Sequence, residues 1–330
     1  MRTLPDGLVL RPYAGLSDVP EMLRVFTASN VADEIDERAS AAFLTTWLTH
    51  PSEHFDPAND LVLAEVDGEV VGYGWAFWVD TTDGLREYLT RGHVHPVWRR
   101  RGVGSAILAR NVAHLRGMSA VHDTDRERVM GTFADERRPG AVALVRANGY
   151  QPVRYFFEML RPTLEAVVIP PMPEGLELRP ISDREGYRRV WDADAEAFMD
   201  HWGGFDASDA SFEEWLDQPD FDPSLFLIAW DGDEIAGGVI NEIDTTENEA
   251  LNRKRGLLAS VFVRRPWRRR GLAAALVARS LLLLRERGMT SAWLGVDADN
   301  PTGALGVYER AGFAVHSRAT AYRKPMEADR

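Results

Sequence analysis

His95-Pro-Val-Trp-Arg-Arg-Arg-Gly-Val-Gly104 and Arg264-Arg-Pro-Trp-Arg-Arg-Arg-Gly-Leu-Ala273 are two copies of one motif. An arginine run by itself is typical of a solvated surface. Here, however, each run lies between a β-branched segment and a glycine that opens an apolar helix. The first amides of a helix have no partner within it, and the helix dipole makes this end positive. We therefore predict two phosphate-binding loops of the same construction.

The motif belongs to a longer repeat. An alignment of Arg99 with Arg268 also brings Gly7-Leu-Val-Leu-Arg-Pro12 close to Gly175-Leu-Glu-Leu-Arg-Pro180, and Ala147-Asn-Gly-Tyr150 close to Arg310-Ala-Gly-Phe313. The length of 330 residues suits two domains of about 150 residues each. The proline-rich segment before Gly175 favours an extended connector. We expect a first domain over 1–162, a linker over 163–174 and a second domain over 175–330.

Hydrophobic patterning predicts the same order of elements in both halves. Two strands joined by an Asp-Gly turn precede a third strand, the motif helix, a strand, a helix and a last strand. The expected elements of the first half are a helix near 19–29, strands at 61–66 and 70–78, a strand ending near Val94, and a helix from Gly102. Those of the second half are strands at 225–230, 235–243 and 257–263, and a helix over 271–285. The fold class is α/β, with each domain a mixed, mostly antiparallel sheet flanked by helices.

Composition narrows the function classes. The chain is 45% hydrophobic and 27% charged, with a net charge of −13, which argues against a nucleic-acid partner. The absence of cysteine excludes disulfides, thiolate metal sites and a cysteine nucleophile, and nothing gives His201 metal-ligand spacing. We expect no metal, no membrane span and no secretory signal, and therefore a cytoplasmic protein.

The strand, the Arg-x-x-Gly-x-Gly/Ala loop and the following helix resemble motif A of the GNAT acetyltransferase superfamily, and both halves follow the element order of that family. In the second half, Val296-Asp-Ala-Asp-Asn300 and Gly306-Val-Tyr308 resemble its late strand and tyrosine-bearing helix. The resemblance implies acetyl-CoA as cofactor. By resemblance it is held by the backbone of Val261, Phe262 and Val263, by Asn300, and by the loop of Arg268, Arg269, Arg270, Gly271, Leu272 and Ala273.

The resemblance also indicates the catalytic groups. Tyr308 matches the tyrosine that many members use as general acid, and a phenol with a pKa of about 10 is protonated at neutral pH. Glu242, late in its strand, is the first candidate for general base. Each residue has a simpler alternative: Tyr308 as a core residue, Glu242 as a solvent-facing strand residue and Asn300 as a helix N-cap.

The first half differs at these positions. Val145 aligns with Tyr308, and Arg137 falls near Asn300 across a loosely aligned loop. Its phosphate loop keeps Val94, Arg99, Arg100, Gly102, Val103 and Gly104. We therefore expect catalysis in the second domain and a catalytically degenerate first domain.

For the acceptor, residues 191–215 combine aromatic and acidic side chains that suit a cationic amine, among them Asp200, His201, Trp202 and Phe205. Two amphipathic helices with solvated acidic faces would give the same pattern. The tandem arrangement resembles the mycothiol synthase group, which acetylates the cysteinyl amine of a small thiol sugar. The sequence thus indicates an N-acetyltransferase for a small-molecule or peptide amine, as a monomer or homodimer. The alternative is a non-catalytic protein that binds or senses acyl-CoA.

Overall fold

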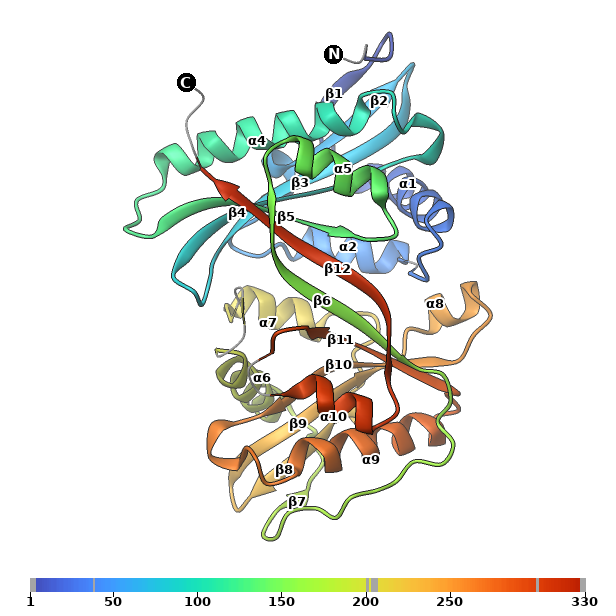
Figure 1. The fold of residues 1–330 in the computed structure, drawn as a ribbon, viewed down its shortest axis with the longest axis vertical. Helices are drawn as coiled ribbons and strands as arrows, with labels where there is room; N and C mark the ends of the chain where they lie inside the picture. Colours follow the sequence, from blue (N-terminus) through green and yellow to red (C-terminus); the bar gives the residue numbers. More distant parts are fainter. Residues whose placement is uncertain (1–3, 38, 200–201, 203–206, 301–302, 327–330) are drawn as a thin grey trace. The chain divides into compact units, whose positions relative to one another are not determined.

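The computed structural model describes residues 4–37, 39–199, 202, 207–300 and 303–326. The chain divides into two compact units (Figure 1). Unit 1 contains the described parts of residues 1–154, 217–219 and 319–330, and unit 2 contains those of 155–216 and 220–318. Each unit is an α/β domain built on a mixed sheet, which confirms the predicted fold class.

The sheet of unit 1 has the order β1-β2-β3-β4-β5-β12. Neighbouring strands are antiparallel except β4 and β5, which are parallel. Its strands are β1 (Val9–Pro12), β2 (Leu61–Val66), β3 (Glu69–Asp80), β4 (Leu85–Val94), β5 (Glu127–Asp135) and the end of β12 (Ala314–Pro325). Its helices are α1 (Val19–Ala32), α2 (Ala41–Thr49), α3 (Pro57–Asp60), α4 (Val103–Val121) and α5 (Pro139–Ala147).

Unit 2 repeats this arrangement with the order β6-β11-β10-β9-β8-β7, in which β10 and β11 are parallel. Its strands are β6 (Gln151–Arg161), β7 (Glu177–Leu178), β8 (Leu227–Asp231), β9 (Glu234–Glu242), β10 (Arg255–Val263) and β11 (Ser291–Asp297). Its helices are α6 (Arg184–Phe198), α7 (Asp209–Leu216), α8 (Thr245–Ala250), α9 (Leu272–Glu286) and α10 (Ala304–Arg310). The predicted strands and motif helices match these bounds to within a few residues.

The two halves exchange their last strands. Residues 156–161 of β6, which end the first half of the sequence, pair with β11 in unit 2. Residues 319–325 of β12 pair with β5 in unit 1, where Arg323 forms a buried ion pair with Glu87 at 2.7 Å. The expected domain boundary at residue 162 therefore differs from the observed units in the placement of these strands. The exchange links regions far apart in the chain, so local patterning carries no signal for it.

Residues 163–174 contain no helix or strand, as expected of a connector. The segment nevertheless packs against unit 2. Leu164 is buried and its amide bonds to the Thr290 carbonyl at 3.0 Å, and Arg279 of α9 bonds to the Pro170 carbonyl at 2.9 Å. The connector is therefore fixed along the surface of this unit.

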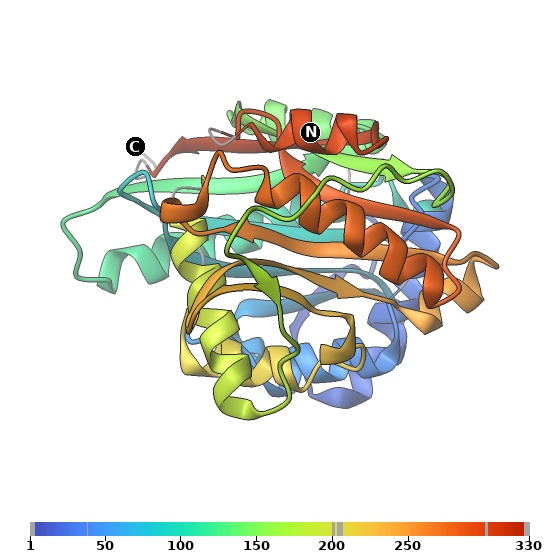
Figure 2. The same ribbon diagram turned by 90° about the horizontal axis from the view of Figure 1, so that it is seen from below.

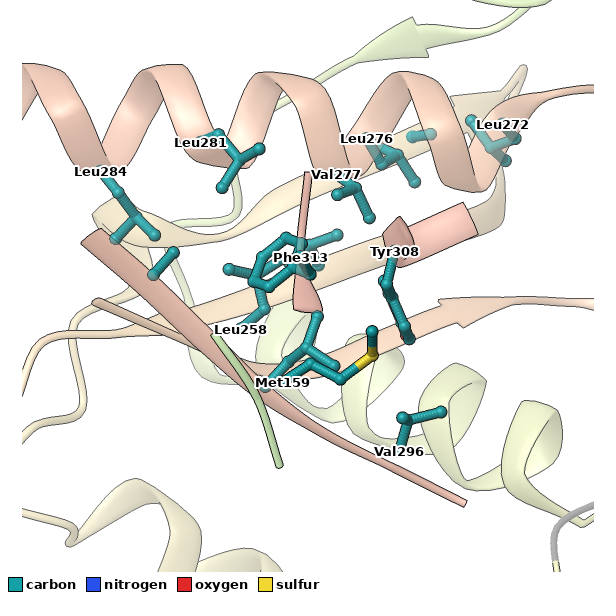
Figure 3. Packing of buried hydrophobic residues seen from close by; sticks show 14 of the residues in the cluster. Met159, Leu258, Leu272, Leu276, Val277, Leu281, Leu284, Val296, Tyr308 and Phe313 are labelled. Atoms are coloured by element: carbon teal, nitrogen blue, oxygen red, sulfur yellow. The ribbon is translucent and has the colours of Figure 1, made fainter. Parts of the chain in front are cut away.

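Helices cover both faces of the sheet of unit 2 (Figure 2), and its buried core lies on both faces. On one face, α9 and α10 pack on Leu258, Leu294 and Met159. On the other, α6 packs on Ile228, Ile240 and Phe262. Figure 3 shows the first cluster, with the leucines of α9 lying along the strands. We call these two sides the α9 face and the α6 face. Among the described residues, no helix combines the length and apolar character needed to cross a membrane.

Candidate active site

The second phosphate loop leads directly into α9. Arg269 (φ 62°) and Gly271 (φ 87°) have left-handed backbone conformations, an alternation that turns successive amides toward one point. The first helical bond runs from Ala275 N to Gly271 O at 3.1 Å, so the amides of Leu272 and Ala273 come before it. A Cβ on Gly271 would have no atom within 4 Å. The loop is open, and its donors fit the pyrophosphate of acetyl-CoA.

The arginines of this loop have unequal surroundings. Arg268 donates from Nε to the Val263 carbonyl at 2.9 Å and from Nη2 to the Ala197 carbonyl at 3.2 Å. Its side chain therefore ties the loop to the end of β10 and to α6. Arg270 bonds to the Glu174 carbonyl in the connector at 3.1 Å and is exposed.

Strand β10 has an irregularity that the sequence did not predict. Its ladder to β9 shifts register between Leu258 and Ser260, and its parallel ladder to β11 ends at Leu257 opposite Trp293. Beyond this point Val261 and Val263 pack on the α9 face, while Phe262 packs on the α6 face. This end of β10 is the segment that the resemblance assigns to the pantetheine arm.

Glu242 ends β9 on the α6 face, because it has the same parity as Ile240 of that core. It is half-buried rather than solvent-facing. Burial raises the pKa of Glu242 to about 7, with a further contribution from the carboxylates of Asp220 and Asp244. A carboxyl group with this pKa can accept and release a proton at neutral pH.

Tyr308 projects from α10 into the core of the α9 face (Figure 3). Its side chain is buried, with the Phe313 ring at a centroid distance of 6.2 Å. Burial raises its pKa well above the ordinary value, so the phenol is protonated throughout the neutral range. The core position and a role as proton donor are compatible.

Asn300 lies in the turn after β11, where its amide bonds to the Asp297 carbonyl at 3.1 Å. Helix α10 begins at Ala304 with Gly303 as its N-cap. The alternative interpretation of Asn300 as the N-cap is therefore wrong. Of the acceptor residues, Asp200, His201 and Phe205 lie outside the described residues. Trp202 is described, with its ring 5.9 Å from that of Phe156.

The first loop has the same backbone as the second. Arg100 (φ 65°) and Gly102 (φ 89°) repeat the left-handed pair, and α4 begins at Val103. Arg99 donates to the Val94 carbonyl, as Arg268 does to that of Val263. This loop is covered, however. The Cβ position of Gly102 is 2.9 Å from Leu4 Cδ2, and that of Gly104 is 3.5 Å from Leu144 Cδ2. Beside it lies an open pocket of about 560 Å³, lined by Pro5, Asp6, Val66, Asp67, Trp98, Arg100 and Arg101.

The turn after β5 corrects one alignment. Arg137 N bonds to Asp135 Oδ1 and Arg138 N to the Asp135 carbonyl. In the second half, Asp299 N and Asn300 N make the same bonds to Asp297. Arg138, not Arg137, therefore takes the place of Asn300. Val145 takes that of Tyr308 as predicted, since their carbonyls accept the equivalent bonds from Tyr150 and Phe313.

One residue of the α6 face, Ser260, was missed by the sequence interpretation, and its partner Asp194 lies in the acidic and aromatic region 191–215 that we predicted for the acceptor. Asp194 of α6 accepts a hydrogen bond from Ser260 of β10 at 2.7 Å. Asp194 shares the buried stripe of α6 with Val190, Ala193 and Ala197. Its place in this stripe separates Asp194 from the solvated carboxylates of the same helix.

Comparisons with known proteins identify the family of the chain. The model of the Acetyltransferase (GNAT) family matches residues 23–129 and 187–313. A mycothiol acetyltransferase of Salinispora arenicola is 31% identical over 312 residues, 93% of this chain and 94% of that protein. One from Geodermatophilus obscurus is 29% identical over 321 residues, 94% of both chains.

Solved structures extend the likeness to the tandem arrangement. The crystal structure of a GCN5-related N-acetyltransferase from Sphaerobacter thermophilus has a TM-score of 0.73 at 28% identity and covers 99% of this chain and 98% of that one. A tandem GNAT protein from the clavulanic acid biosynthesis pathway has a TM-score of 0.71 at 19% identity, over 98% and 100% of the two chains, which shows a shared fold. The chain belongs to the acetyltransferase (GNAT) family, as a tandem-domain N-acetyltransferase that uses acetyl-CoA.

Proposed function

We propose that unit 2 transfers the acetyl group of acetyl-CoA directly to a primary amine, with Glu242 as general base and Tyr308 as general acid. Bound acetyl-CoA supplies the thioester carbonyl that the amine attacks. The observation that carries the proposal is that the two groups lie on opposite faces of the sheet and have the protonation states that their tasks require. Glu242, with a pKa of about 7, lies on the α6 face, and the protonated Tyr308 lies on the α9 face.

The two groups then have separate tasks. Glu242 takes a proton from the amine nitrogen, either directly or through water, and Tyr308 gives its phenolic proton to the departing sulfur. The amine is acetylated, coenzyme A leaves as the thiol, and no covalent enzyme intermediate forms. The loop of Gly271 holds the pyrophosphate, and the end of β10, from Val261 to Val263, holds the pantetheine arm. We assign the first domain a non-catalytic role.

For the acceptor we propose a small-molecule amine, and first the cysteinyl amine of a thiol sugar. The support is that relatives spanning at least 93% of this chain are mycothiol acetyltransferases. The acidic groups on the α6 face suit a cationic acceptor. A cytoplasmic location is consistent with a chain that has no cysteine.

The test is acetyl-CoA-dependent release of thiol over a panel of amines, aminoglycosides, amino acids and peptides, because a protein without cysteine contributes no background. For desacetyl-mycothiol, which has its own thiol, the product is measured by mass spectrometry. We expect acceptor-dependent turnover that falls by about 10² or more in Tyr308→Phe. Coenzyme binding without turnover over the whole panel would contradict the proposal and favour a sensing protein.

A further inference from the structure

A hydroxyl and a carboxyl group on the α6 face have no role in the mechanism described so far. We propose that Ser260, oriented by Asp194, binds the amino group of the acceptor and selects amines over alcohols. The inference rests on the proposed function, since it concerns the acceptor of the same site.

The position of Ser260 is the first argument. It follows the irregularity in β10 and lies beyond Leu257, where the ladder to β11 ends. It pairs with Ile240 and therefore shares the α6 face with Glu242, two residues further along β9. Diagonal neighbours on one face have Cα atoms about 7–8 Å apart, within reach of their side chains. An amine between them can contact both Ser260 and Glu242.

The hydrogen bond to Asp194 is the second argument. Ser260 Oγ donates to Asp194 Oδ1 at 2.7 Å, so the lone pairs of the serine oxygen are left to accept from another donor. An amine keeps a second N–H to donate after it gives one proton to Glu242. An alcohol has a single O–H, so it cannot donate to both groups.

The surroundings of Asp194 are the third argument. Its side chain is almost fully buried, at 6% exposure. In the part of the chain that the structure describes, Ser260 is its one hydrogen-bonding partner, and it has no ion pair. Arg264, which reaches α6 through Glu196, is paired with Glu196 and Glu234. A buried carboxyl without a cation is costly, and burial raises the pKa of Asp194 to about 7. A cationic amine would supply the missing positive charge.

The corresponding positions in unit 1 give an internal contrast. Register with the neighbouring strand places Arg91 where β10 has Ser260. The bonds from Arg99 to the Ser29 carbonyl and from Arg268 to the Ala197 carbonyl align α1 with α6, which places Phe26 where α6 has Asp194. The hydroxyl and carboxyl pair therefore occurs only in the unit that also carries Glu242 and Tyr308.

The experiment is steady-state kinetics of the full-length protein with the acceptor that gives turnover in the panel. Ser260→Ala is expected to raise the KM for the acceptor about 10-fold or more, with the KM for acetyl-CoA changed less than about 2-fold. Ser260→Thr, which keeps the hydroxyl, should recover most of the loss. Asp194→Asn, which keeps the shape but removes the charge, should also raise the KM for the acceptor.

Ser280→Ala is the matched control, because Ser280 accepts a side-chain hydrogen bond from Asn241 on the α9 face. It should alter the unfolding temperature without changing the ratio of the two KM values. An unchanged acceptor KM in Ser260→Ala, or an equal rise of both KM values, overturns this inference while the proposed function stands. A wild-type protein that turns over no amine overturns both.

Discussion

The two units share a backbone but differ at each proposed chemical position. Arg100 and Gly102 repeat the left-handed pair of Arg269 and Gly271 to within a few degrees. Strand register and equivalent hydrogen bonds then align the proposed catalytic and binding positions. The residues of unit 1 and unit 2 at these positions are Phe26 and Asp194, Phe77 and Glu242, Arg91 and Ser260, Arg138 and Asn300, and Val145 and Tyr308.

The parallel strands also differ. In unit 1 the parallel ladder between β4 and β5 has six residue pairs and ends at Thr90 and Thr132. The antiparallel ladder between β4 and β3 has no register shift. In unit 2 the corresponding parallel ladder has three residue pairs, and β10 has an irregular step. A bulge re-aims side chains and disrupts pairing. Both units therefore contain the phosphate loop, whereas the shortened ladder and the polar side chains that we propose for the chemistry lie in unit 2.

Unit 1 fills the corresponding region with its own side chains. Arg138 reaches from the turn after β5 to α1, with an ion pair to Asp33 at 3.3 Å and a hydrogen bond to Asn30. It also lies beside His93, whose pKa burial lowers to about 3, with further lowering by the charges of Arg138, Arg91 and Arg99. His93 is therefore neutral at physiological pH and unsuited to serve as a cationic acid there.

The largest effect is expected from a substitution of the proposed general base in unit 2. Glu242→Gln should lower kcat by about 10² to 10⁴, since it removes the general base and leaves the shape. Phe77→Leu, the matched change in unit 1, should leave kcat within about 2-fold. Both are measured by thiol release at saturating substrates. Equal losses in the two variants would show that the units act together in catalysis.

The pH profile sharpens the assignment. With a pKa of about 7, Glu242 is protonated at low pH, so kcat should rise about 10-fold per pH unit below 7 and level off above it. Asp194 has a pKa in the same range, so the two must be separated. Asp194→Asn should keep the inflection and Glu242→Gln should lose it. An inflection that persists in Glu242→Gln would assign the base elsewhere.

The two phosphate loops can be tested against each other. Gly271→Ala places a side chain at a φ of 87°, where L-residues are strained, and should weaken acetyl-CoA binding about 10-fold. Gly102→Ala meets Leu4 and should lower stability with little effect on turnover. Isothermal titration with acetyl-CoA measures the affinity and stoichiometry of each variant. Loss of activity in Gly102→Ala, together with retained activity in Tyr308→Phe, would reverse the assignment of the domains.

The sequence predicted the local features and missed those that depend on distant partners. The phosphate loops follow from a glycine between strand and helix, and the strands follow from alternation and Asp-Gly turns. The exchange of β6 and β12 depends on pairing between residues more than 100 positions apart. The irregular step near Ser260 has no marker, because no glycine or proline lies at it. The counterpart of Asn300 was predicted near Arg137 and is Arg138. The prediction was one position off because the loop before this residue differs in length between the halves.

The smallest expected effect is on stability, and it tests the burial of Glu242 independently of catalysis. Its pKa is about 7 in the folded chain and about 4.3 in an unfolded one. The folded state therefore holds the proton more tightly, and the stability that this contributes is present below pH 4.3 and lost as pH rises through 7.

Glu242→Gln keeps a neutral group at every pH. Relative to the wild type, it should be more stable by about 1–3 kcal/mol at pH 8 and nearly equal at pH 4.5. Thermal unfolding at both pH values measures this difference. Glu249→Gln, at an exposed position, serves as the control. It should change the free energy of unfolding by the same small amount at both pH values. A Glu242→Gln difference that does not depend on pH would mean that the carboxyl is solvated, which would remove the physical basis for its role as a base near neutrality.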